Sequence, residues 1–154
     1  MGKEIERKFL VKDNTWRGQD AGKRYRQGYL STVKERTVRL RIAGDKGFLT
    51  VKGITVGASR SEYEYEIPVA DANEMLDQLC ERPLIEKTRY RISHAGLLWE
   101  LDEFEGENRG LITAEVELKD EHQSVTPPGW IGEEVTGDPR YFNANLVAKP
   151  FTTW

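Results

Sequence analysis

The sequence has a single cysteine, Cys80, among 154 residues. A lone thiol excludes an intrachain disulfide and a zinc site built from several cysteines. Long apolar runs are also missing, and charged residues begin at Lys3. Nothing in the sequence therefore predicts a signal region or a membrane-spanning helix. These absences predict a cytoplasmic protein.

The chain also has little net charge. It carries 23 basic and 26 acidic residues, which gives a formal net charge of -3. The broad basic surface that binds nucleic acid or anionic membranes is therefore not expected. Balanced signs, together with 10% aromatic residues, also argue against a disordered chain. The length is that of one domain, so we expect residues 1–154 to form a single domain.

Alternation of apolar and polar residues with a period of two dominates the chain. It predicts eight strands, which cover residues 3–12, 23–31, 36–42, 47–52, 60–69, 85–92, 97–105 and 111–119. Two helices are predicted as well. Asp71 is the expected cap of the first, which ends before Pro83, and the second begins at Asp138-Pro139. The apolar stripe of the first helix is Met75, Leu76, Leu79 and Cys80. This pattern predicts the α+β class, mainly β, with few helices.

Charged side chains occupy the polar face of most predicted strands. Glu62 and Glu64 share one strand face, and Lys87 and Arg89 share the face of another. A solvated sheet face explains any one such strand. On several strands, nearly all charged side chains of this face have the same sign. A solvated face explains this less well, because neighbouring carboxylates repel one another unless a cation compensates them.

A closed barrel would explain these charges, because it would place them around an internal space. Eight strands enclose a space that can hold one small ligand. Unpaired ions are too costly in a dry interior, so the lumen would be wet and would receive a highly charged ligand. Basic and acidic sectors suit a polyanion with a divalent metal, and carboxylates without a Cys or His cluster favour Mg²⁺ or Mn²⁺ over zinc. The alternative is an ordinary sheet protein, such as an interaction scaffold, with its charges on outer faces.

A series of short motifs extends along essentially the whole chain. It begins with Glu4-Ile5-Glu6-Arg7-Lys8, which matches an E-x-E-x-K pattern. Further motifs are Gln27-Gly28-Tyr29-Leu30, Arg39-Leu40-Arg41, Val51-Lys52, Glu62-Tyr63-Glu64, Glu86-Lys87-Thr88-Arg89-Tyr90, Glu100-Leu101-Asp102, Glu115-Val116-Glu117 and Glu134-Val135-Thr136. In this order they resemble the CYTH superfamily, also called triphosphate tunnel metalloenzymes, and especially its short, single-domain bacterial members.

The resemblance implies an eight-stranded antiparallel tunnel, open at both ends and charged inside. It also implies roles for residues at matching positions. The expected metal ligands are Glu4, Glu6, Asp102, Glu115 and Glu117. The expected phosphate-binding residues are Lys8, Arg39, Arg41, Lys52, Lys87 and Arg89. The expected catalytic residues are Lys8, which would stabilise charge developing on phosphoryl oxygens, and Glu62 and Glu64, which would organise the basic side chains or a second metal.

By the same resemblance, the chain is expected to use Mg²⁺ or Mn²⁺ to hydrolyse a phosphoanhydride of a small-molecule triphosphate. The short form, without an appended domain, favours inorganic triphosphate. Alternatives within the family are thiamine or nucleoside triphosphatases and class IV adenylate cyclases, which convert ATP to cyclic AMP. A non-catalytic polyphosphate-binding module is the alternative of another class. Apolar strand faces that the helices leave uncovered would support a homodimer.

Overall fold

The computed structural model describes residues 3–154, and its main feature is one antiparallel sheet of ten strands. The strands are β1 (Glu4–Val11), β2 (Lys23–Ser31), β3 (Thr37–Ala43), β4 (Lys46–Lys52), β5 (Ser59–Arg60), β6 (Glu62–Ile67), β7 (Ile85–His94), β8 (Leu97–Phe104), β9 (Ile112–Glu117) and β10 (Ile131–Glu134). The predicted class, mainly β with few helices, is confirmed.

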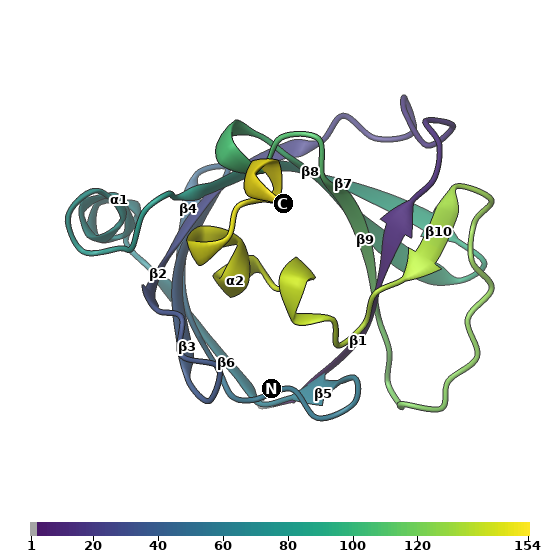
Figure 1. Ribbon diagram of the computed structural model, residues 1–154, viewed down its shortest axis with the longest axis horizontal. Helices are drawn as coiled ribbons and strands as arrows, with labels where there is room; N and C mark the ends of the chain where they lie inside the picture. Colours follow the sequence, from purple (N-terminus) through teal and green to yellow (C-terminus); the bar gives the residue numbers. More distant parts are fainter. Residues whose placement is uncertain (1–2) are drawn as a thin grey trace.

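The sheet curls into a ring, as Figure 1 shows. The strands follow the order β10-β1-β9-β8-β7-β2-β3-β4-β6, and β5 pairs with β1. Glu4 lies opposite Arg60 in this short ladder, and the chain continues through Ser61 into β6. Eight continuous strands were expected, and this number is wrong. The predicted strand at 60–69 is divided at Ser61, so that its first part joins β1 and its second part joins β4. The sheet returns to its first strand through this two-residue ladder.

One apolar cluster lies on the outer surface of β1, β7, β8 and β9. Trp99, Leu101 and Val116 are at most 1% exposed. The loops after β1 and β9 contribute Trp16 and Trp130 to the same cluster. Because successive side chains of a strand point to opposite faces, the charged residues between these apolar ones face into the ring.

A second apolar cluster lies where the C-terminal segment enters the ring. Helix α2 (Asn143–Ala148) lies within the ring of strands in Figure 1. Its Leu146 is fully buried in one cluster with Tyr29, Ile85 and Phe104, from β2, β7 and β8. The inner surface is therefore apolar in this region, and the C-terminal segment packs against it. The expectation of a tunnel with both ends open is corrected accordingly.

Helix α1 (Val69–Gln78) lies outside the ring against β3 and β4. It buries Ala72 and Leu76, so of the four residues of the predicted apolar stripe only Leu76 is buried, while Met75 and Cys80 are half-buried. The predicted cap is wrong, because Pro68 is the N-cap and Asp71 lies in the first turn. Leu79 follows the helix and is 63% exposed.

Asp138 does act as a cap, but of the short 3-10 helix η2 (Pro139–Tyr141), where its side chain accepts a hydrogen bond from the Arg140 N–H. Helix α2 begins separately at Asn143. Two further 3-10 helices, η1 (Gly106–Asn108) and η3 (Phe151–Thr153), complete the elements. No helix within residues 3–154 combines the length and the apolarity needed to cross a membrane.

Candidate active site: a charged cavity inside the ring

A cavity of about 570 Å³ is lined by inward-facing side chains of the sheet and by the C-terminal segment. Charged residues dominate its wall, with eight basic and six acidic side chains among the described residues. The basic ones are Lys8, Lys34, Arg39, Arg41, Lys52, Arg60, Lys87 and Arg89, and the acidic ones are Glu4, Glu6, Glu62, Glu100, Glu115 and Glu117. All six predicted phosphate-binding residues thus meet in one cavity.

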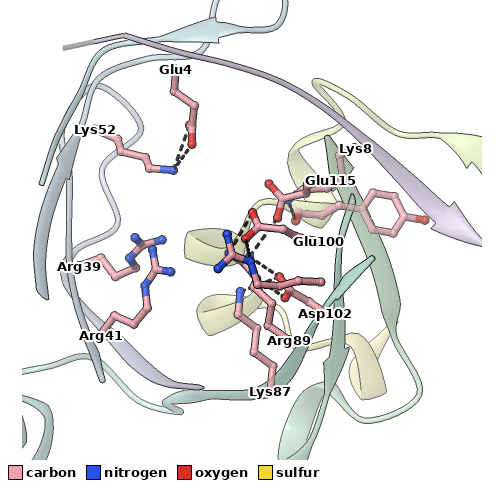
Figure 2. Close-up of polar contacts among 12 residues, drawn as sticks. Glu4, Lys8, Arg39, Arg41, Lys52, Lys87, Arg89, Glu100, Asp102 and Glu115 are labelled. Atoms are coloured by element: carbon pink, nitrogen blue, oxygen red, sulfur yellow. Dashed lines mark hydrogen bonds and ion pairs between the residues drawn. The ribbon is translucent and has the colours of Figure 1, made fainter. Parts of the chain in front are cut away.

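Two arginines of β3 form one basic wall. Figure 2 shows Arg39 and Arg41 side by side. Glu64 of β6 holds both, with its Oε1 3.5 Å from Arg39 Nη2 and 3.6 Å from Arg41 Nη2. The same oxygen accepts a hydrogen bond of 2.7 Å from the Thr50 hydroxyl. Glu64 does not itself line the cavity, so it contacts the arginines without facing the space where a ligand would bind.

These two arginines are not fully hydrogen-bonded within the part of the chain that the structure describes. The Nε atoms of Arg39 and Arg41 are buried and have no hydrogen-bond partner among residues 3–154. Burial, with the nearby charges of Arg39 and Arg89, lowers the pKa of Arg41 to about 10. The positive charge of this wall is therefore only partly compensated, and an anion would stabilise it.

The second basic wall comes from β7. Lys87 and Arg89 converge on Asp102 of the neighbouring β8, as Figure 2 shows. Asp102 accepts hydrogen bonds of 2.7 Å from Lys87 Nζ, 2.7 Å from Arg89 Nε and 2.8 Å from Arg89 Nη2. Burial lowers the pKa of Lys87 to about 7, although Asp102 opposes this shift. Asp102 was expected to bind metal, but here both of its oxygens are bound to cationic side chains.

The carboxylates of β1 and β9 face each other across one ladder. Glu6 pairs with Glu117, and Lys8 pairs with Glu115. Burial, Glu115 and Glu4 raise the pKa of Glu6 well above its ordinary value. Burial disfavours ionisation of Glu115 too, but Lys8 and Arg89 hold the pKa of Glu115 well below its ordinary value. Of the two carboxyl groups, Glu6 therefore binds a proton more readily than Glu115.

Lys52 and Lys8 connect this acidic cluster to its surroundings. Lys52 Nζ lies 3.0 and 3.1 Å from the two carboxylate oxygens of Glu4, and 3.5 Å from Glu62. Lys8 Nζ donates a hydrogen bond of 3.0 Å to the carbonyl oxygen of Tyr141. Lys8 thus lies between the carboxylates and the C-terminal segment.

Several residues of the site were not predicted. The ring of Tyr25 supports the basic wall, with its centroid 5.2 Å from the guanidinium carbons of both Arg41 and Arg89. Tyr25 is four positions from Tyr29, which lines the cavity from the same strand, so the two side chains share one face. Asn143 and Asn145 also line the cavity. No sequence signal could place them, because only tertiary packing brings α2 into the ring.

Comparison with known proteins agrees with this architecture. The family model of the CYTH domain matches residues 2–151. An inorganic triphosphatase of Acetivibrio thermocellus is 56% identical, over 98% of this chain and 97% of the relative. An inorganic triphosphatase of Nitrosomonas europaea is 44% identical, over 94% of this chain and 96% of the relative.

Solved structures give the same result. The crystal structure of the inorganic triphosphatase NE1496 superimposes with a TM-score of 0.67 at 40% identity, and the match covers 93% of this chain and 96% of that one. A putative adenylate cyclase from Bacillus halodurans shares the fold, with a TM-score of 0.55 at 21% identity over 79% of this chain and 84% of that one. The order of motifs, the ring of strands and these relatives agree, and the chain belongs to the CYTH domain family.

Proposed function

We propose that this protein is a divalent-metal-dependent phosphohydrolase whose substrate is inorganic triphosphate. The observation that carries the proposal is the convergence of Arg39, Arg41, Lys87 and Arg89 on a cavity whose other wall is carboxylate. Arginine binds phosphate oxygens through a planar fork of N–H donors, and lysine binds them as a point charge. The names of the two relatives, both inorganic triphosphatases, support the same substrate.

A divalent cation is implied by the family, and the donors of this site fit one. Glu4, Glu6, Glu115 and Glu117 are hard oxygen ligands on paired strands, which suit Mg²⁺ or Mn²⁺. Burial, and after it the neighbouring Glu115 and Glu4, raise the pKa of Glu6, so a cation bound here would stabilise the ionised carboxylates. Within the described residues, no three acidic, imidazole or thiol groups form a complete metal site in their present positions. Side-chain rotation must complete the set, for example by moving Glu4 away from Lys52.

Individual residues would then have separate roles in phosphoryl transfer, a reaction in which positioning and electrostatics dominate. The two basic walls hold the phosphate chain in line. Lys8 stabilises charge that develops on the phosphoryl oxygens. Glu62 lines the cavity, and its nearest basic group is Lys52 at 3.5 Å, so its carboxylate can orient the attacking water. When bound, the metal ion would neutralise charge on the phosphate oxygens.

The first test is phosphate release from inorganic triphosphate, pyrophosphate, ATP and thiamine triphosphate with Mg²⁺, Mn²⁺ or EDTA. Metal-dependent release chiefly from inorganic triphosphate is the expected result. Cyclic AMP formed from ATP without orthophosphate would make the protein a cyclase instead. Triphosphate binding without any turnover would make it a polyphosphate-binding module.

The second test uses three variants, Glu4→Ala, Glu6→Ala and Glu117→Ala. Each should lower kcat at least about 100-fold, because each removes a metal ligand from the reaction. Glu74→Ala is the matched control, since Glu74 lies exposed on α1 outside the ring. Near-normal rates in all three cavity variants would refute the assignment of the metal ligands.

We also propose that two copies associate through the outer face of β6. Tyr63 and Tyr65 are 46% and 59% exposed there, and they lie beside Val51 and Leu49 of β4. Sedimentation equilibrium should give a dimer for the parent protein and a monomer for Tyr65→Lys.

A cytoplasmic location is proposed as well, supported by the single thiol of the chain, and cell fractionation would test it.

A further inference from the structure

Asp102 occupies a different place from the other predicted metal ligands. Glu4, Glu6, Glu115 and Glu117 all line the cavity, whereas Asp102 does not. Its side chain is only 1% exposed. It lies on β8 directly opposite Arg89 of β7. The carboxylate is therefore behind the basic side chains and not beside the space where a ligand would bind.

The hydrogen bonds of Asp102 leave it little capacity for a metal ion. Oδ1 accepts from Arg89 Nε at 2.7 Å, and Oδ2 accepts from Arg89 Nη2 at 2.8 Å and from Lys87 Nζ at 2.7 Å. A carboxylate has about four acceptor sites, and three of these are used. A divalent ion here would also lie within a few ångströms of two buried positive charges, which repel it strongly at low dielectric.

The same contacts fix the two cations. The paired bonds to Arg89 set the plane of its guanidinium, since such a fork constrains geometry as well as energy. The remaining Arg89 contacts are long, at 3.5 Å to Glu100 and 3.5 Å to Glu115. Arg89 is therefore oriented chiefly by Asp102. Lys87 uses one of its three N–H donors on Asp102 and keeps the others for a ligand.

We infer, on the basis of the proposed phosphohydrolase function, that Asp102 is a positioning residue that aims Lys87 and Arg89 at the substrate phosphates and does not bind metal. It acts through these two side chains and touches no reacting atom. Removing its charge should therefore weaken phosphate binding and leave the metal site intact.

Isothermal titration calorimetry on Asp102→Asn separates the two roles. Inorganic triphosphate is titrated in EDTA, where no metal-dependent turnover occurs, and Mn²⁺ is titrated separately without triphosphate. The triphosphate Kd should rise roughly 10-fold or more, because Lys87 and Arg89 lose the alignment of their charge-assisted hydrogen bonds to phosphate. The Mn²⁺ Kd should stay within about 2-fold of the parent value. Glu115→Gln is the comparator and should weaken Mn²⁺ binding instead.

A Mn²⁺ affinity that falls in Asp102→Asn as much as in Glu115→Gln, with triphosphate affinity unchanged, would overturn the inference. If the variant does not fold, anomalous diffraction from Mn²⁺-soaked crystals of the parent protein decides the question. Manganese held by glutamates, with Asp102 still on Arg89, supports the positioning role, and an Asp102 oxygen bound to manganese refutes it. Both binding measurements remain decisive even if the parent protein hydrolyses no triphosphate, so the inference and the proposed function can fail separately.

Discussion

Metal binding to this protein should release a proton, and the source of that proton is Glu6. Burial and the neighbouring Glu115 and Glu4 raise the pKa of Glu6 well above its ordinary value. Lys8 and Arg89 hold the pKa of Glu115 below its ordinary value, so Glu6 is the carboxyl of this pair that binds a proton more readily. A divalent cation that uses both carboxylates must displace this proton, because metal ligands bind in their deprotonated form.

The magnitude follows from that single proton. While Glu6 is protonated, each rise of one pH unit should strengthen metal binding about 10-fold, or about 1.4 kcal/mol. Above the raised pKa of Glu6 the affinity should become constant. Because the pKa of Glu6 is raised in the folded protein, protonated Glu6 stabilises the metal-free fold at low pH. This contribution to the free energy of unfolding is lost as the pH rises through the folded pKa of Glu6. The increase of Tm on adding metal should therefore be larger at alkaline than at acidic pH.

Calorimetric titration of Mg²⁺ in two buffers with different ionisation enthalpies counts the released protons directly. The parent protein should release close to one proton per ion on the acidic side of the Glu6 titration. Glu6→Gln cannot ionise, so its weaker metal binding should show no proton release from this position. A parent protein that releases no proton, with a Kd that is constant from about pH 5.5 to 8, would refute the reasoning.

Other predictions concern the walls and the core. Lys87→Met should leave stability unchanged or raise it, because burial already disfavours the charged lysine and Arg89 still pairs Asp102; a clear decrease in calorimetric Tm would contradict this. Glu64→Gln should raise the triphosphate Kd several-fold and leave the Mn²⁺ Kd unchanged, since Glu64 contacts Arg39 and Arg41 but does not line the cavity. Leu76→Ala should cost about 2–5 kcal/mol in urea unfolding, because this side chain is fully buried under α1, and its KM for triphosphate should not change.

Much of the fold could be predicted because half-buried strands alternate with a period of two. The strand at 23–31 was predicted with the bounds that β2 has, and the strand at 85–92 differs from β7 only at its C-terminal end. The same parity placed the charged residues. Arg39 and Arg41, or Lys87 and Arg89, face one side because they are two positions apart. Their convergence on a cavity then followed from curling of the sheet.

Parity gives the face of a strand but not the depth of a residue. Glu100 and Asp102 have the same parity on β8, yet Glu100 lines the cavity and Asp102 is buried behind it. Parity alone therefore could not tell that Asp102, predicted as a metal ligand, lies behind Lys87 and Arg89. Likewise, the sequence of α2 predicts an apolar helical face, but nothing local says that Leu146 packs inside the ring. Both the depth of Asp102 and the position of Leu146 depend on long-range packing, which leaves no local pattern in the sequence.

The ladder between β1 and β9 has a consequence for synthesis of the chain. It brings Glu6 beside Glu117, and Lys8 beside Glu115, across more than a hundred positions of sequence. A nascent chain that has emerged only as far as β8 can display most of its basic side chains but lacks Glu115 and Glu117. Such distant pairings form slowly, because the loop between them must close first. Synthesis therefore delivers all six predicted phosphate-binding residues, with Glu4 and Glu6, before Glu115 and Glu117 exist, and premature termination after β8 would leave a fragment that has the basic residues of the site but only part of its carboxylates.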